Sequence, residues 1–153
     1  MGTKRCFFIG HRDTTNYIVP ALETAIIYHI QKLGVTEFIV GHYGSFDKIV
    51  ASTLVKAKQQ YPCIKLTLLL PYHPAERKSL LPKGFDGSFY PDGMENVPLK
   101  AAIIRANKYA VDHSNYLIAA VWHAASNSRD VLEYAYSREK KGLITVTLLE
   151  QLY

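Results

Sequence analysis

The stretch Glu37–Asp47, which reads Glu-Phe-Ile-Val-Gly-His-Tyr-Gly-Ser-Phe-Asp, governs how this chain of 153 residues folds. It opens with a short apolar run, which predicts a buried strand. Gly41, Gly44 and Ser45 follow, and a helical pattern begins at about Asp47. The free N–H groups and positive dipole end of such a helix favour an anion, and glycine lets a phosphate approach the backbone. An ordinary strand-to-helix turn has the same composition, so this stretch alone leaves a binding role open.

Apolar runs and helical patterns alternate along the rest of the chain. Strands are predicted at 4–9, 38–40, 64–70, 116–121 and 143–149, with a short edge strand at 87–90. Helices are predicted from the capping residues 14–16 to Gly34, and at about 46–60, 99–113 and 130–140. The strands lack strict polar alternation, which is typical of parallel strands covered on both faces. We therefore expect an α/β protein: a Rossmann-like, doubly wound, mostly parallel sheet with helices on both faces, as a single domain over residues 1–153.

Composition limits the classes of function. Hydrophobic residues make up 48% and charged residues 20%, as in ordinary soluble proteins. No apolar run approaches the roughly 20 residues that cross a bilayer, so we expect no membrane partner. Cys6 and Cys63 lie in or next to predicted strands and are expected to be core residues, which favours a reducing, cytoplasmic location. The net charge of +5 permits an anionic ligand or nucleic acid without requiring either.

Four loops are predicted at one edge of the sheet. In doubly wound sheets, ligands bind at the carboxyl ends of the strands. The loops 10–13, 41–45, 71–74 and 122–129 lie there, and each carries glycine or polar residues. The candidate ligand-binding residues are Gly10, His11, Arg12, Gly41, His42, Gly44, Ser45, Asp47, Tyr72, Trp122, Ser126, Asn127, Ser128 and Arg129.

Several of these residues allow two interpretations. The guanidinium of Arg12 suits a bidentate clamp on a phosphate, or a surface salt bridge with Asp13. His11 and His42 occupy equivalent positions in two loops, where each suits acid–base chemistry or a structural hydrogen bond. Asp47 suits either a bond to a ribose hydroxyl or a helix cap. These alternatives stay open at the level of sequence.

Tyr72 and Trp122 follow predicted strands. Their rings suit either a sandwich around a base or packing at the rim of the site. The histidines do not have metal-ligand spacing, so we expect no metal. No Gly-x-Gly-x-x-Gly fingerprint, Walker A motif or Gly-x-Ser-x-Gly elbow is present, which argues against NAD, ATP hydrolysis and a serine triad. We expect no cofactor, only a nucleotide-like ligand.

Three motifs resemble a known family. They are Gly10-His-Arg12, Gly41-His-Tyr-Gly-Ser-Phe-Asp47, and residues 105–119, Arg-Ala-Asn-Lys-Tyr-Ala-Val-Asp-His-Ser-Asn-Tyr-Leu-Ile-Ala. In them the chain resembles the SLOG superfamily, which includes the "lonely guy" phosphoribohydrolases, the DNA-processing protein A domain and small single-domain uncharacterised bacterial proteins. The last branch is the most similar, and the resemblance covers nearly the whole chain. It implies a Rossmann-like fold that binds a nucleotide or nucleotide-derived ligand across the strand ends.

One family motif is altered. The family's enzymes carry Pro-Gly-Gly-x-Gly-Thr-x-x-Glu after a later strand, whereas residues 123–133 here read His-Ala-Ala-Ser-Asn-Ser-Arg-Asp-Val-Leu-Glu. The resemblance implies Glu133 as the catalytic residue, with Arg105 or Arg12 assisting. The glycine cradle is replaced, and Asn115 stands where the family usually has Asp. These departures argue against phosphoribohydrolase activity and leave binding in place.

Three functions therefore remain open. The first is binding or sensing of a nucleotide-derived small molecule, with catalysis not established. The second is an N-glycosidase of the phosphoribohydrolase type that acts on nucleoside monophosphates. The third is binding of single-stranded nucleic acid, for which the net charge of +5 and an aromatic content of 12% are suitable. A homodimer is also left open, because periodicity does not separate a core from an interface.

Overall fold

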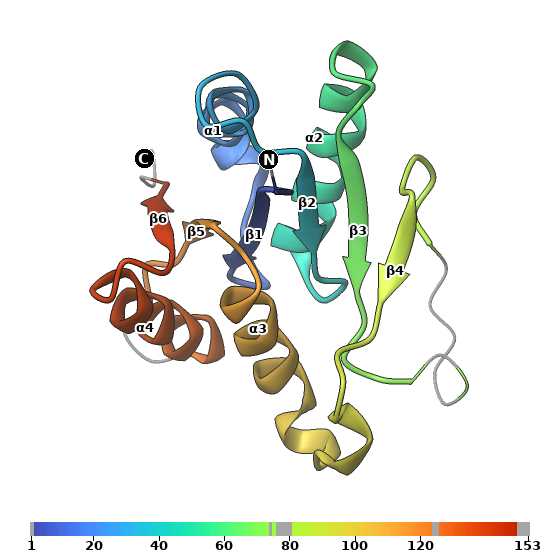
Figure 1. The fold of residues 1–153 in the computed structure, drawn as a ribbon, viewed down its shortest axis with the longest axis vertical. Coiled ribbons are helices and arrows are strands. Elements are labelled where there is room, and N and C mark those ends of the chain that lie inside the picture. The colour runs from blue at the N-terminus through green and yellow to red at the C-terminus, as the bar shows by residue number, and fades with distance from the viewer. Residues whose placement is uncertain (1, 74, 76–80, 124–125, 150–153) are drawn as a thin grey trace.

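Six strands form one parallel sheet in the order β4-β3-β2-β1-β5-β6 (Figure 1). The computed structural model describes residues 2–73, 75, 81–123 and 126–149. The strands are β1 (Arg5–Gly10), β2 (Glu37–Val40), β3 (Lys65–Leu69), β4 (Gly87–Phe89), β5 (Tyr116–Ala120) and β6 (Thr145–Leu148). In the central strand, Cys6 pairs with Phe38 on one side and with Tyr116 on the other. The chain builds outward from β1 to β4 and then crosses to β5, so the strand order reverses beside β1.

Two helices cover each face of this sheet (Figure 1). The helices are α1 (Val19–Gln31), α2 (Ser45–Gln60), α3 (Ala102–Asp112) and α4 (Asn127–Glu139). Three short 3₁₀ helices occupy Asn16–Ile18, Met94–Asn96 and Leu99–Ala101. The helix pair α1 and α2 packs on one side and the pair α3 and α4 on the other. The expected Rossmann-like α/β fold is confirmed.

The central strand explains why its sequence is apolar without alternation. Cys6 and Phe8 pack into the core beneath α1 and α2, whereas Phe7 and Ile9 pack into the core beneath α3 and α4. All four side chains are buried. A strand between two helical layers has no face exposed to water, so both sets of alternate positions are hydrophobic.

The structure confirms one predicted detail and corrects two others. The edge strand is confirmed as β4, at the end of the sheet. The last helix begins at Asn127, three residues before the predicted start, because Ser126 caps it by accepting a hydrogen bond from the N–H of Arg129. The expectation for Cys63 was wrong: this thiol is exposed, because it lies in the turn before β3, whereas Cys6 is buried.

Candidate functional site

Hydrogen bonds join the loops at the carboxyl edge of the sheet. The N–H of Ser45, at the start of α2, donates to the carbonyl of Arg12 at 2.9 Å. The hydroxyl of Ser128, in the first turn of α4, donates to the carbonyl of Gly10 at 2.8 Å. The N-terminal ends of α2 and α4 are therefore both held against the loop that follows β1.

A narrow cavity of about 70 Å³ lies where these loops meet, and we call it the strand-end crevice. It lies beside the point where the strand order reverses, which is the usual ligand position in open α/β sheets. Its lining includes the following glycine and polar residues: Gly10 at the end of β1 and Arg12 after it, Gly41 and Tyr43 after β2, Asp47 on α2, Asn107 on α3, and Asn127 and Ser128 on α4. The structure thus brings together predicted residues from three of the four loops.

Two glycines are required where the loops approach one another. A Cβ on Gly10 would lie 2.3 Å from the ring of Phe46, which is buried in the core. Gly44 has a φ of 99°, and a Cβ there would also lie 2.8 Å from the Cα of Arg12. Only glycine fits this left-handed backbone and this close approach.

His11 joins two loops through hydrogen bonds to its ring. Its Nε2 accepts hydrogen bonds from the N–H groups of Trp122 at 2.9 Å and His123 at 3.1 Å. An acceptor nitrogen carries no proton, so the ring is neutral with its proton on Nδ1. Burial, and then the nearby His123, lower the pKa of His11. This geometry fits the structural interpretation of His11 better than acid–base chemistry.

Asp47 lies in the first turn of α2. Its carboxylate accepts a hydrogen bond from the N–H of Tyr43 at 2.9 Å. Burial raises the pKa of Asp47 to about 7, against the opposing effects of the Tyr43 N–H and the Arg12 guanidinium. The bond to Tyr43 holds the turn that precedes the N-cap residue Gly44 and does not satisfy a free N–H of the helix, while the position in the crevice keeps the carboxyl within reach of a ligand.

Arg12 is exposed and lines the crevice. Within the described part of the chain it forms no ion pair with Asp13. The carboxylate of Asp13 instead lies 3.8 Å from Nε2 of His123. The guanidinium of Arg12 thus remains beside the crevice, where an anion would find it.

The residues that the family resemblance implied as catalytic lie elsewhere. The side chain of Glu133 is 64% exposed, and its carboxylate lies 3.3 Å from Nε of Arg129 on the same helix. Arg105 is exposed on α3. Glu133, Arg105 and Arg129 do not line the crevice. The structure therefore does not bring Glu133 and Arg105 to the place where the loops converge.

Tyr72 and Trp122 pack on opposite faces of the sheet. Trp122 adjoins the core beneath α1 and α2 and meets the ring of His11 edge-on, with 4.5 Å between the ring centroids. Tyr72 adjoins the core beneath α3 and α4 and meets Tyr43 edge-on at 6.1 Å. The structure does not pair the two rings around a common space.

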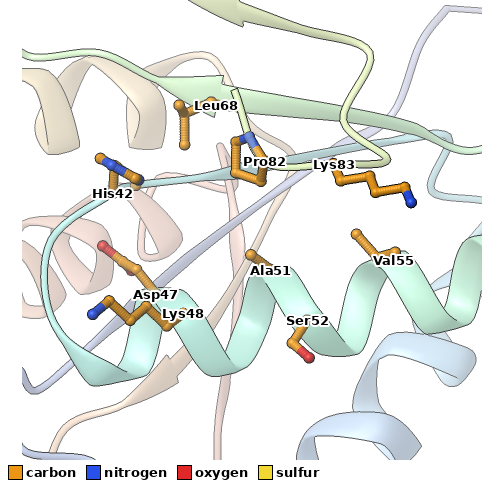
Figure 2. Close-up of a pocket in the computed structure, with 10 residues that line it drawn as sticks. His42, Asp47, Lys48, Ala51, Ser52, Val55, Leu68, Pro82 and Lys83 are labelled. Carbon is orange, nitrogen blue, oxygen red and sulfur yellow. The ribbon is translucent and has the colours of Figure 1, made fainter. Parts of the chain in front are cut away.

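A second, larger cavity of about 360 Å³ opens between α2 and β3, and we call it the α2–β3 pocket (Figure 2). It shares Gly41 and Asp47 with the crevice. Its other lining residues are His42, Lys48, Ala51, Ser52, Val55, Leu68, Pro82 and Lys83. Of the predicted site residues, only Gly41, His42 and Asp47 line it.

The structure adds residues that sequence reasoning missed. Asn107 reaches the crevice with Ile103 and Ala106. These positions share one face of a helix, so helical spacing offered a signal for Asn107 once its neighbours were placed. Pro82 and Lys83 reach the α2–β3 pocket only through tertiary packing, and nothing in their local sequence indicates it.

Among the described residues, no group of three or more His, Cys, Asp or Glu side chains is placed to hold a metal ion. No helix in the same part of the chain is long and apolar enough to cross a membrane.

Comparison with known proteins gives a likeness of fold. No protein-family model matches the chain, and no curated protein sequence matches it. Its structure is similar to that of DNA processing protein A from Helicobacter pylori, solved for its single-stranded DNA binding mode, with a TM-score of 0.64 and 18% identity. The match covers 97% of this chain and 66% of that one, so this chain spans just under two thirds of its length. The chain therefore has a fold like that of DNA processing protein A.

Proposed function

We propose that this protein binds the phosphate-bearing part of a nucleotide or nucleotide-derived ligand in the strand-end crevice. The observation that carries this proposal is the convergence of two helix starts, those of α2 and α4, on a cavity lined by Arg12. Helix N-termini and a guanidinium both favour an oxyanion, and Gly10 and Gly41 line the same cavity. We also propose that the chain is a SLOG protein, which the three motifs and the likeness to DNA processing protein A support.

Binding without established catalysis fits the geometry better than N-glycosidic cleavage. A phosphoribohydrolase of the expected kind needs Glu133 at the ribosyl centre. That side chain is exposed, pairs with Arg129 and does not line the crevice. The proposal therefore assigns no catalytic role to Glu133 or Arg105.

Single-stranded nucleic acid is a second candidate ligand. The likeness to a structure solved for its single-stranded DNA binding mode favours it, together with a net charge of +5. In this alternative, the crevice holds one backbone phosphate of the strand, because phosphate contacts position a nucleic acid without reading its sequence.

The test is a thermal-shift screen with nucleoside mono- and diphosphates, cyclic dinucleotides, ADP-ribose, NAD and oligothymidylate, followed by chromatography of each mixture. A ligand that binds only the folded state raises the melting temperature. We expect a rise with intact ligand, and we expect Arg12→Ala to weaken binding about tenfold or more, since a charge-assisted hydrogen bond is lost. Lys100→Ala, which removes an exposed cation outside both cavities, is the matched control.

Three results would contradict these assignments. The absence of any shift with every ligand would remove the proposed function. Equal binding by wild type and Arg12→Ala would remove the crevice as its site. Release of free base that Glu133→Gln abolishes would show that the protein is an N-glycosidase after all.

A further inference from the structure

We propose that the α2–β3 pocket holds the planar ring of the ligand whose phosphate occupies the strand-end crevice, so that the ligand crosses the sheet edge at the end of β2. This inference rests on the proposed function and adds the part of the molecule that distinguishes one nucleotide from another. It assigns a role to a cavity that extends from the loop after β2 along α2.

The pocket has the shape of a slot with apolar walls. Ala51 and Val55 on α2 face Leu68 on β3 and Pro82 across the space (Figure 2). Its volume of about 360 Å³ lies within the range of small-molecule sites. Aliphatic groups on both sides of a narrow space suit a flat, uncharged ring, because both faces of the ring then leave water and contact apolar side chains.

The pocket and the crevice meet at two shared residues. Gly41 and Asp47 line both cavities. A Cβ on Gly41 would lie 2.8 Å from Oδ2 of Asp47, so glycine is what allows the carboxyl to stand at this boundary. A ligand with its phosphate in the crevice and its ring in the pocket would place its sugar beside Asp47, which suits a bond to a ribose hydroxyl.

Charge at the mouth of the pocket favours a ligand with an electron-rich edge. Lys48 and Lys83 line the pocket and are exposed, and His42 stands at the end nearest Asp47 (Figure 2). Among the described residues of this lining Asp47 is the one carboxylic acid, and its burial keeps it largely uncharged below neutral pH. A phosphate-linked ring therefore meets a positive rim.

The outer wall of the pocket is anchored to the rest of the molecule. Phe85 is buried in the core beneath α1 and α2, and its N–H donates to the carbonyl of Pro82 at 3.1 Å. The carboxylate of Asp86 accepts hydrogen bonds from Nζ of Lys58 at 2.7 Å and from the N–H of Leu66 at 2.8 Å. The slot thus exists before a ligand arrives, which lowers the entropy cost of binding.

Calorimetry with two kinds of probe separates the pocket from the crevice. Ribose 5-phosphate has the phosphate and the sugar but no ring, and the nucleoside 5′-monophosphates have all three. We expect at least one monophosphate to bind wild type about tenfold or more tighter than ribose 5-phosphate. Ala51→Leu, which fills the slot, is expected to bring that monophosphate down to the affinity of ribose 5-phosphate and to leave ribose 5-phosphate within about twofold of its wild-type value.

A charge variant tests the pocket without filling it. The side chain of Lys83 is exposed, and Lys83→Glu is expected to weaken the affinity for the monophosphate about threefold or more, since an attraction becomes a repulsion. Lys56→Glu, on α2 but outside the pocket, is the matched control and is expected to change the affinity less than twofold, about the scatter of a surface charge.

The outcomes distinguish the two proposals. Equal affinity of wild type for ribose 5-phosphate and every monophosphate overturns the ring pocket while the crevice stands. The same conclusion follows if Ala51→Leu and Lys83→Glu both leave the preference unchanged. If neither probe binds, the ring pocket is overturned, and the proposed function fails with it when no other ligand of the thermal-shift screen binds either. If Arg12→Ala binds both probes as wild type does, the crevice and the ring pocket both fail.

Discussion

His11 shows how one side chain joins two distant loops, because it bonds Trp122 and His123, which lie 111 and 112 residues after it in the chain. Its ring is buried, and its Nε2 satisfies two backbone N–H groups at once. A buried donor without an acceptor loses its hydration and gains nothing in return. This nitrogen therefore holds Trp122 and His123 in the loop after β5, while Ser128 holds the start of α4 against Gly10.

Replacement of His11 tests that dependence. We expect His11→Ala to lower the free energy of unfolding by about 1–3 kcal/mol, because two part-buried N–H groups lose their acceptor. His11→Gln, whose amide oxygen can accept, should cost less. Urea unfolding measures both, with His113→Ala, an exposed histidine, as the control. Equal costs for His11→Ala and His113→Ala would contradict this role of His11.

Asp47 makes stability depend on pH in an unusual direction. Its pKa is 3.8 in the unfolded reference and about 7 in the folded protein. Between these values the folded state holds a proton that the unfolded state lacks, so the free energy of unfolding falls as pH rises from about 4 to about 7. Most buried acids with ionic partners have a lowered pKa and show the opposite slope.

Asp47→Asn removes this titration and keeps an oxygen that can accept from the N–H of Tyr43. We expect the variant to gain stability over wild type as pH rises, by roughly 1.4 kcal/mol per pH unit at most within that range. Urea unfolding at unit steps of pH measures the difference. Parallel stability curves for the two proteins would show that the Asp47 carboxyl ionises as in water.

At the scale of elements, the start of α4 is the most consequential difference between the predicted and the observed structure. Ser126 accepts from the N–H of Arg129 at 3.0 Å and fixes the first turn, from which Ser128 reaches the carbonyl of Gly10. We expect Ser126→Ala to destabilise the protein by about 1 kcal/mol and Ser126→Asp to retain stability, as for other helix caps. Thermal unfolding compares them with Ser137→Ala, an exposed serine on the same helix. A loss as large in Ser137→Ala would mean that the cap contributes nothing specific.

The elements themselves were largely predictable because their patterns are local. Apolar runs marked β1, β3 and β5, and even the short edge strand β4 followed from residues between turns. The start of α4 was placed late because three small polar residues, Ser126, Asn127 and Ser128, suit a cap, a loop or a first turn equally well.

The candidate site was predictable only in part. Residues that follow strands, such as Arg12 and Asp47, were found because every parallel strand ends at the same edge. The direction of a side chain on a helix or beyond a long loop depends on packing, so Asn107 and Lys83 were missed. Glu133 was placed by motif resemblance, and its helix presents that side chain to solvent.

At the scale of the whole molecule, the salt dependence of binding distinguishes the two candidate ligands. A single strand that contacts several phosphates releases counterions from each, so log K falls with log salt by about 0.7 per phosphate contacted. If nucleic acid is the ligand, oligothymidylate affinity should fall steeply with salt, and Arg12→Ala should make the slope shallower by about one contact. Fluorescence anisotropy across a salt series, with a mononucleotide as competitor, measures the slope of oligothymidylate affinity against salt for wild type and for Arg12→Ala. A flat response for oligothymidylate would exclude this candidate.

The pairing of β1 has a consequence for how the chain folds. Its first partner, β2, follows after one helix, but its second partner, β5, comes more than 100 residues after it, as Cys6 opposite Tyr116 shows. Contacts so distant in sequence form slowly, because a long loop must close before they are gained. We expect β1, β2 and β3 to assemble early, with one side of β1 unpaired until β5 arrives. The strand that is made first therefore stays open on one side while β2, β3 and β4 are made, and its open edge is where a neighbouring chain could add a strand during synthesis.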